Sequence, residues 1–130
     1  MDVIKRSVAG IAIEQGKCFI ARRIPGGALG EKWEFPGGKV EPDETDETAL
    51  LREYQEELGV PISIGPFLGE SSFEYQGPHK VYAYRVYLKG ADFKLADHTE
   101  WRWACLEEIK TLDFAESDRK LFPYLEPHLD

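Results

Sequence analysis

The chain has 130 residues, which is enough for one domain with a buried core that needs no disulfide or metal to fold. Its 24 acidic residues outnumber its 16 basic residues, and the net charge of −8 argues against a nucleic-acid polymer or an anionic membrane as a partner. We therefore expect a single domain over residues 1–130.

The two cysteines, Cys18 and Cys105, lie in strand-like apolar stretches without the C-x-x-C spacing of a zinc or redox site. We expect both to be buried free thiols, which suits the reducing cytoplasm. No segment approaches the roughly 18 apolar residues of a membrane span, and residues 1–13 lack the features of a signal peptide. The expected location is the cytoplasm.

The first two predicted elements are strands that form a hairpin. Residues 3–13 are rich in β-branched and small apolar side chains, and a turn at 14–17 separates them from an apolar stretch at 18–22. Arg23 follows, just before a glycine-rich loop at 25–30. A basic residue at a strand end either faces solvent or meets a nucleotide.

A second glycine-rich segment, W-E-F-P-G-G-K-V, occupies residues 33–40. Gly37 and Gly38 have no Cβ, so their carbonyls can come close to a metal ion or a phosphate. Lys39 is placed either to meet a phosphate or to pair with neighbouring carboxylates. Phe35 is expected in the core, with stacking on a nucleobase as the alternative.

A helix is predicted over residues 46–58. Thr45 is a suitable N-cap, the first turn is acidic, and Gly59 stands where a left-handed residue would end the helix. At roughly 100° per residue, one face of this helix is apolar and another is acidic. The apolar face comprises Leu50, Leu51, Tyr54 and Leu58, and the acidic face comprises Glu53, Glu56 and Glu57.

The acidic face has the composition of a site for a hard cation. Like charges three or four residues apart each destabilise a helix by about 0.2–0.5 kcal/mol unless a cation or an arginine compensates them. Arg52 can neutralise only one carboxylate, so the others indicate an all-oxygen site suited to Mg²⁺ or Mn²⁺. The alternative is an acidic face exposed to solvent.

After the helix, residues 61–65 form a short extended piece. Two strands are then predicted at 68–75 and 81–88, joined by a turn at 76–79 into a second hairpin. A polar loop at 92–100 precedes another predicted strand at 101–106.

The C-terminal part is predicted to be helical. Residues 107–110 form one helical turn and residues 116–125 a longer helix. Pro123 should kink that helix or end it near Leu121, because proline lacks the backbone N–H that the interior of a helix uses.

The segment from Gly38 to Val60 resembles the signature of the Nudix hydrolases. The matching residues are Gly38, Glu44, Arg52, Glu53, Tyr54, Glu56, Glu57, Gly59 and Val60. Only Tyr54 departs from the family pattern, which usually has an aliphatic residue there, and this difference concerns packing rather than chemistry. The residues W-E-F-P-G-G-K-V-E at 33–41 are similar to the MutT-like branch in particular.

This resemblance implies an α/β Nudix fold, a mixed β-sheet sandwiched between helices. It also implies a Mg²⁺- or Mn²⁺-dependent hydrolase that converts a nucleoside triphosphate to the monophosphate and pyrophosphate, in a MutT-like removal of oxidised nucleotides such as 8-oxo-dGTP. Alternatives are a (d)CTP pyrophosphohydrolase, a hydrolase of dinucleoside polyphosphates or sugar nucleotides, and a non-catalytic nucleotide sensor. Sensors usually have a damaged signature, whereas this one keeps every charged position.

The resemblance further implies roles for single residues. The implied metal ligands are Glu56, Glu57, Glu53 (as a ligand or as the base that orients water) and a carbonyl of Gly37 or Gly38. Arg52 would hold the carboxylates in place, and Glu44 would support the loop or helix from behind. Relatives often add one more carboxylate before the strand at 101–106, and we prefer Asp97 over Glu100 by counting back from Trp103.

Two residues match positions that contact the nucleotide in this branch. Arg23 resembles an arginine at the nucleotide site. Asp118 lies where relatives have an Asn or Asp that reads the base, although an acid there would also stabilise a helix N-terminus. An ionised carboxylate only accepts hydrogen bonds, and guanine presents N1–H and N2–H₂ side by side, so we expect a guanine-type substrate.

Overall fold

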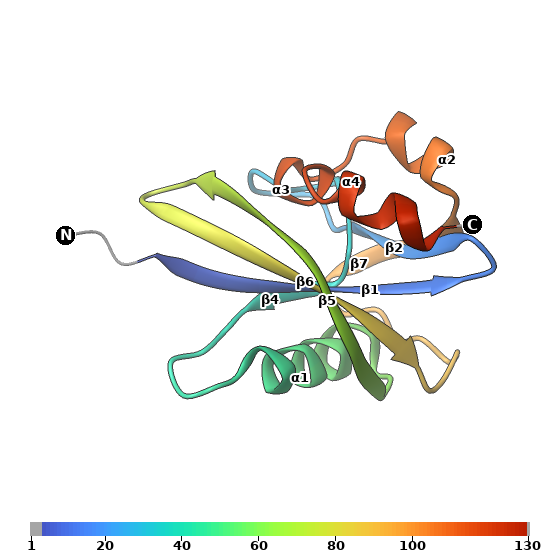
Figure 1. The fold of residues 1–130 in the computed structure, drawn as a ribbon, viewed down its shortest axis with the longest axis horizontal. Helices are drawn as coiled ribbons and strands as arrows, with labels where there is room; N and C mark the ends of the chain where they lie inside the picture. The colour runs from blue at the N-terminus through green and yellow to red at the C-terminus, as the bar shows by residue number, and fades with distance from the viewer. Residues whose placement is uncertain (1–3, 130) are drawn as a thin grey trace.

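The computed structural model describes residues 4–129, which form a seven-stranded sheet with helices on both faces (Figure 1). The strands are β1 (Lys5–Glu14), β2 (Lys17–Arg23), β3 (Trp33–Glu34), β4 (Gly37–Lys39), β5 (Ile62–Glu74), β6 (Pro78–Leu88) and β7 (His98–Ala104). The helices are α1 (Asp46–Leu58), α2 (Leu106–Thr111), α3 (Glu116–Arg119), α4 (Phe122–Leu125) and the 3₁₀ turn η1 (Glu126–His128). Val3, where the first predicted strand begins, lies outside the described residues.

The sheet is mixed, as predicted. Its main order is β3-β2-β1-β6-β5, with β4 paired to β1 and β7 paired to β2. β1 and β6 run parallel, whereas the other pairs are antiparallel. Both predicted hairpins are present, β1 with β2 and β5 with β6.

Two hydrophobic cores lie on opposite faces of this sheet. Ile11 of β1 belongs to the core beneath α2, α3 and α4, and its neighbour Ala12 belongs to the core beneath α1 (Figure 1). This alternation follows from the two-residue period of a strand. The α/β sandwich expected from the sequence is therefore confirmed.

Helix α1 has the predicted bounds and caps. The Thr45 hydroxyl accepts a hydrogen bond from the Thr48 backbone N–H at 3.1 Å, and Gly59 takes the left-handed conformation with φ of 68°. The predicted apolar face was wrong at Leu51, which is 44% exposed, whereas Glu57 is buried. The buried stripe follows positions 50, 54 and 58, and Leu51 lies a further 100° around the helix on its solvent side.

Several predicted strand boundaries were wrong, among them the start of β6, which lies at Pro78 rather than at residue 81. The pieces at 61–65 and 68–75 form one strand, β5, whose pairing with β6 is irregular between Ile64 and Gly69. Pro66 lies in this interval and has no N–H to donate to the ladder, which explains the interruption. β7 begins at His98, inside the predicted loop, because His98 pairs with Arg23 after a register shift in β2.

The predicted C-terminal helix is interrupted close to Pro123, as the sequence indicated. α3 ends at Arg119, and a separate α4 begins at Phe122 with Pro123 in its first turn. Proline is tolerated in a first turn because the N–H groups there have no intrahelical partner.

Both cysteines are free thiols, as expected. Cys18 is buried, but the expected burial of Cys105 was wrong, since it is exposed where the chain enters α2. Within residues 4–129, none of the helices is long and apolar enough to cross a membrane.

Candidate active site

The candidate site lies where α1 faces the short strand β4. β4 pairs with β1, and a Cβ on Gly37 would overlap the Val8 carbonyl oxygen there. On the helix side, a Cβ on Gly38 would lie 2.6 Å from the Glu53 carboxylate. Glycine at both positions lets β4 lie close to β1 and to the acidic face of α1 at once.

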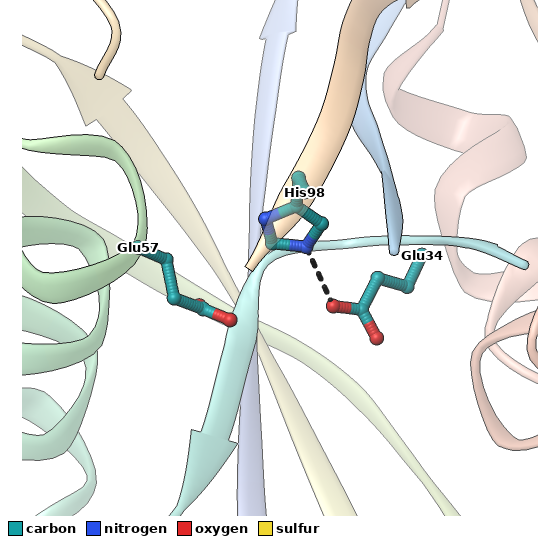
Figure 2. Close-up of side chains that lie close together, drawn as sticks. All are labelled: Glu34, Glu57 and His98. Carbon is teal, nitrogen blue, oxygen red and sulfur yellow. Dashed lines mark hydrogen bonds and ion pairs between the residues drawn. The ribbon is translucent and has the colours of Figure 1, made fainter. Parts of the chain in front are cut away.

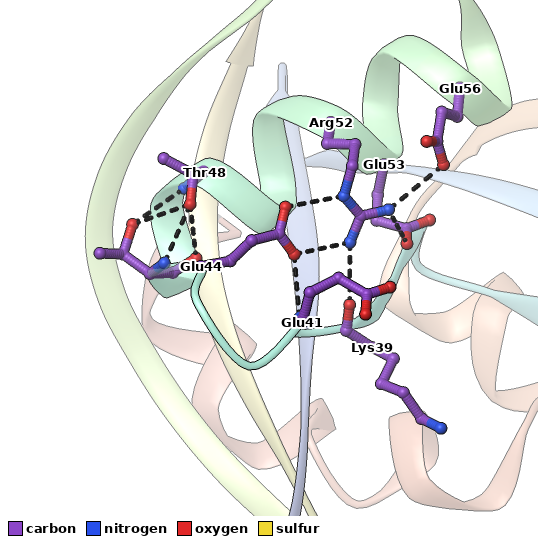
Figure 3. Close-up of polar contacts among 8 residues, drawn as sticks. Lys39, Glu41, Glu44, Thr48, Arg52, Glu53 and Glu56 are labelled. Atoms are coloured by element: carbon purple, nitrogen blue, oxygen red, sulfur yellow. Dashed lines mark hydrogen bonds and ion pairs between the residues drawn. The ribbon is translucent and has the colours of Figure 1, made fainter.

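Arg52 binds three of the acidic side chains around it (Figure 3). Its guanidinium donates to both oxygens of Glu44, at 2.7 and 2.8 Å. Nη1 donates to Glu53 at 2.8 Å and to Glu56 at 3.2 Å, and Nη2 donates to the Lys39 carbonyl at 3.0 Å. The single arginine therefore joins the helix to the β4 loop and fixes the positions of the carboxylates.

Glu44 is fully engaged by these contacts. Besides Arg52, one of its oxygens accepts a hydrogen bond from the Glu41 backbone N–H at 2.9 Å. The Arg52 hydrogen bonds, and then the Glu41 N–H, lower the pKa of Glu44 to about 2. Glu44 thus stays ionised and holds Arg52 against the loop; its supporting role in catalysis stays a prediction.

Glu53 and Glu56 differ in environment. The Glu53 carboxylate is largely buried, and this burial raises its pKa although the Arg52 hydrogen bond acts in the opposite direction. Glu56 is exposed and touches Arg52 only through the weaker 3.2 Å contact. The acidic face is therefore graded from an exposed to a buried carboxylate.

Glu57 is the buried end of this gradient, with 4% of its surface exposed. Its carboxylate accepts one hydrogen bond, from the Gly37 N–H at 3.2 Å. Burial, together with the charges of Glu34 and Glu53, raises the pKa of Glu57 to about 9. In the part of the chain that the structure describes, no lysine, arginine or histidine forms an ion pair with Glu57.

These carboxylates fit a hard divalent cation. Glu53, Glu56 and Glu57 offer only oxygen atoms, the donors that Mg²⁺ and Mn²⁺ take in proteins. A buried carboxylate without a cationic partner is costly unless a proton or a metal ion neutralises it. Among the described residues no basic side chain pairs with Glu57, so in the metal-free protein its raised pKa lets a proton neutralise it, and a metal ion would replace that proton.

The structure adds two residues that the sequence did not predict for the site. Glu34 of β3 and His98 of β7 are both buried, and His98 Nε2 lies 2.9 Å from Glu34 Oε2 (Figure 2). One ligand atom each of Glu34, Glu57 and His98 lies within 4.8 Å of the others. The one signal in the sequence was a glutamate inside the apolar run Trp33–Phe35, where a charge needs a partner.

Asp97 and Glu100, the two candidates for a further carboxylate ligand, lie on either side of His98. The Asp97 side chain is exposed, and its carbonyl accepts a hydrogen bond from Ile24 N at 3.0 Å. Glu100 lies 3.2 Å from Arg22. Among the described residues, neither carboxylate belongs to the cluster formed by Glu34, Glu57 and His98.

The residues expected to contact a nucleotide lie in different surroundings. Arg23 Nη1 lies 3.3 Å from Glu34 Oε2. Phe35 is buried and packs edge-on against Phe114, the core arrangement. Lys39 is exposed, and Figure 3 shows its ammonium pointing away from the carboxylates that Arg52 binds.

Asp118 is buried at the start of α3 and accepts a hydrogen bond from the Phe35 N–H at 2.9 Å. Burial, and then the charge of Glu34, raises the pKa of Asp118 to about 8, although the Phe35 N–H acts against them. This raised pKa opposes the expectation of an ionised acceptor near pH 7, and the base that Asp118 would read stays a prediction. A neutral acid donates one hydrogen bond as well as accepting.

Comparison with known proteins supports a common origin for this site. The family model described as the NUDIX domain matches residues 4–125. A putative 8-oxo-dGTP diphosphatase 2 of Mycobacterium tuberculosis is 34% identical over 115 residues, which are 86% of this chain and 81% of the relative. The CTP pyrophosphohydrolase of Escherichia coli is 33% identical over 112 residues, 85% of this chain and 83% of the relative.

Solved structures give the same result. The MutT protein from Methanosarcina mazei superposes with a TM-score of 0.81 at 29% identity, covering 98% of this chain and 96% of that one. A MutT hydrolase from Burkholderia pseudomallei, at 18% identity, shares the fold with a TM-score of 0.84 over 95% of this chain and 99% of that one.

Proposed function

The chain belongs to the Nudix hydrolase family, and we propose that it cleaves nucleoside triphosphates to the monophosphate and pyrophosphate with the carboxylates of α1 as its metal site. The observation that carries the proposal is the carboxyl group of Glu57, buried beside Glu53 and facing β4 with no basic side chain paired to it among the described residues. Such a group is costly in a structural role and useful for binding a cation.

The residues that would hold Mg²⁺ or Mn²⁺ are Glu53, Glu56, Glu57 and a carbonyl of Gly37 or Gly38. Asp97 and Glu100 are the candidates for one further oxygen ligand. The bound ions would neutralise charge on the polyphosphate and activate a water for attack on phosphorus.

The protein's own groups would position the reaction. Arg52 holds Glu53 and Glu56 in place through the hydrogen bonds of Nη1, while Glu44 holds Arg52 by two contacts. Glu53, whose carboxylate has a raised pKa, is placed to orient the attacking water or to accept its proton. Glu44 supports this arrangement without facing the substrate.

The nucleotide would extend from this face toward Arg23 and Asp118. Arg23 would meet the nucleotide as a cation, and Lys39, with its exposed ammonium, would meet a phosphate. Asp118 would read the base, with Phe35 contributing through the backbone N–H that holds the Asp118 carboxylate.

Two substrates deserve direct comparison. We take 8-oxo-dGTP as the leading substrate, in line with the name of the mycobacterial relative. Hydrolysis of 8-oxo-dGTP in the cytoplasm would remove it from the nucleotide pool and so protect DNA. A specific observation favours CTP or dCTP as the second: a neutral Asp118 can donate to the N3 acceptor of cytosine and accept from its amino group.

The deciding experiment compares kcat/KM for 8-oxo-dGTP, dGTP, dCTP and CTP in the presence of Mg²⁺, with identification of the products. We expect monophosphate and pyrophosphate from each substrate, the highest kcat/KM for 8-oxo-dGTP, and no turnover in EDTA. A tenfold preference for dCTP or CTP, about 1.4 kcal/mol of transition-state binding, would establish the cytidine alternative. Undiminished turnover in EDTA would show that the metal site is assigned incorrectly.

A further inference from the structure

His98 is a buried imidazole with two different sides. Figure 2 shows its ring between the carboxylates of Glu34 and Glu57, with Nε2 joined to Glu34 by a hydrogen bond. Nε2 lies 2.9 Å from Glu34 Oε2, and in the tautomer in which Nε2–H donates to that carboxylate, Nδ1 carries a free lone pair.

This lone pair has no partner within residues 4–129. Nδ1 of His98 is buried without a hydrogen bond, and its residue is only 4% exposed. Glu57 forms no ion pair, whereas Glu34 already has Arg23 at 3.3 Å. Among the described residues, a buried nitrogen without a hydrogen bond and a buried carboxyl group without a basic partner thus lie in the same cluster.

The spacing of the cluster is close to that of metal ligands. One ligand atom from each of Glu34, Glu57 and His98, with either ring nitrogen of His98 eligible, lies within 4.8 Å of the other two. Two ligands at about 2.1–2.2 Å from one ion are at most about 4.4 Å apart, so a small side-chain adjustment would bring them onto a common ion.

We propose that His98 Nδ1 and the Glu57 carboxylate hold a divalent first-row transition ion, with Glu34 as the outer partner that orients the imidazole. Metal-binding histidines commonly donate their other N–H to a carboxylate, the arrangement that Glu34 provides. Imidazole nitrogen favours transition ions such as Mn²⁺, Co²⁺ or Zn²⁺ over Mg²⁺.

The charges agree with this assignment. Arg23 lies 3.3 Å from Glu34, so within residues 4–129 the Glu57 carboxyl group is the acidic member of the cluster without a basic side chain paired to it. A divalent ion held by this pair keeps a net positive charge and can attract a polyphosphate.

The nitrogen site shares Glu57 with the proposed all-oxygen site and rests on the proposed function to that extent. The two differ in their donor atoms. The carboxylates of Glu53 and Glu56 accept Mg²⁺ and Mn²⁺ alike, whereas the position beside His98 distinguishes transition ions from Mg²⁺.

The test uses Mn²⁺ as the probe and detects nitrogen ligation by pulsed electron paramagnetic resonance. We expect the intact protein to show ¹⁴N coupling to bound Mn²⁺ and His98→Gln to lose it, with at least roughly tenfold weaker binding at that site. His79→Gln is the matched control, because His79 stacks on Phe73 away from the cluster. Glu34→Gln should keep the coupling but weaken Mn²⁺ binding by roughly 10–100-fold.

A measurement without substitution covers the case in which His98→Gln fails to fold. Protein labelled with ¹⁵N-histidine should convert the ¹⁴N signal to a ¹⁵N signal, in wild type and in His79→Gln alike. Bound Mn²⁺ without nitrogen coupling, in a protein that hydrolyses nucleotides with Mg²⁺, would overturn the inference and leave the proposed function standing. Nitrogen coupling in a protein that hydrolyses no nucleoside triphosphate would support the nitrogen site and overturn the proposed function.

Discussion

The Tyr54 side chain of α1 fits against β1 because the residue opposite it, Gly10, has no side chain. The ring is fully buried, and its hydroxyl donates to the Gly10 carbonyl at 2.7 Å. A Cβ on Gly10 would lie 2.5 Å from Tyr54 Cε2. The family usually has an aliphatic residue at position 54, and Gly10 on β1 provides the space that the larger tyrosine ring needs here.

This pairing predicts a coupling between two substitutions. Gly10→Ala should destabilise the protein by about 1–3 kcal/mol, because it forces the Tyr54 ring out of place. In a Tyr54→Leu background the same change should cost much less, since the ring is gone. Denaturant unfolding of both single variants and the double variant measures the coupling, and simple additivity would contradict it.

Glu57 predicts a specific pH dependence of metal-free stability. Its folded pKa of about 9 exceeds the ordinary value of 4.5, so the folded state holds a proton that the unfolded state has lost across this range. Stability in EDTA should therefore fall as pH rises from about 4.5 to about 9. Glu44, with its lowered pKa, changes stability only at more acidic pH.

Glu57→Gln should remove much of this decline while lowering kcat at least roughly a hundredfold. Thermal melts in EDTA across this pH range, beside kcat with Mg²⁺, test both expectations. A variant that is inactive because it unfolds, as judged by circular dichroism, would speak against the assignment of Glu57.

Asp118 predicts that base preference changes with pH. Ionisation above its pKa of about 8 leaves only acceptors, which suits guanine, whereas the neutral acid also suits cytosine. The ratio of kcat/KM for dGTP to that for dCTP should rise between about pH 6.5 and pH 8.5, and Asp118→Asn should abolish the rise. A pH-independent ratio in the wild type would exclude Asp118 as the titrating reader of the base.

At the scale of elements, the contact between β4 and α1 determines where Glu53 points. Gly38→Ala would place a Cβ 2.6 Å from the Glu53 carboxylate, the flexible end of a long side chain. We expect the fold to survive and kcat to fall roughly tenfold or more as Glu53 is displaced. Gly90→Ala is the matched control, because its nearest neighbour, Val60 Cγ1, is 3.7 Å away. Equal activity of the two variants would argue against a positional role for Glu53.

The sequence predicted α1 and its carboxylates because their signals are local. The cap at Thr45, the left-handed Gly59 and the helical period all lie within one short segment. Glu34 and His98 were missed because they are 64 positions apart and meet only through tertiary pairing. β2 pairs with β3 on one side and with β7 on the other, and such strand pairing cannot be read from periodicity.

The errors at element level have physical causes of the same kind. Leu51 is apolar yet exposed because the sheet covers a narrower stripe of α1 than the pattern of apolar residues suggested. The pKa of Asp118 depends on burial and on Glu34, which only the folded arrangement brings near. In both cases the property belongs to contacts between elements rather than to the residue itself.

For the molecule as a whole, metal binding and stability should be linked. An ion that binds the folded state stabilises it by about 2.7 kcal/mol when its concentration is a hundred times the dissociation constant. Because binding must displace the proton of Glu57, Mg²⁺ should raise Tm more at about pH 8 than at about pH 6. Melts with Mg²⁺ and with EDTA at both pH values test this, and a Glu57→Gln protein with an equal Mg²⁺ effect would refute the linkage.

The parallel ladder between β1 and β6 also has a consequence for how the chain folds. It pairs Lys5 with His79 and Ala12 with Val86, so each contact closes a loop of 74 residues (79 − 5 and 86 − 12). The β1–β2 and β5–β6 hairpins need only local turns and can form early, whereas this ladder carries a large loop-closure entropy and should form late. During synthesis, β1 must therefore wait without its central partner until β6 has left the ribosome.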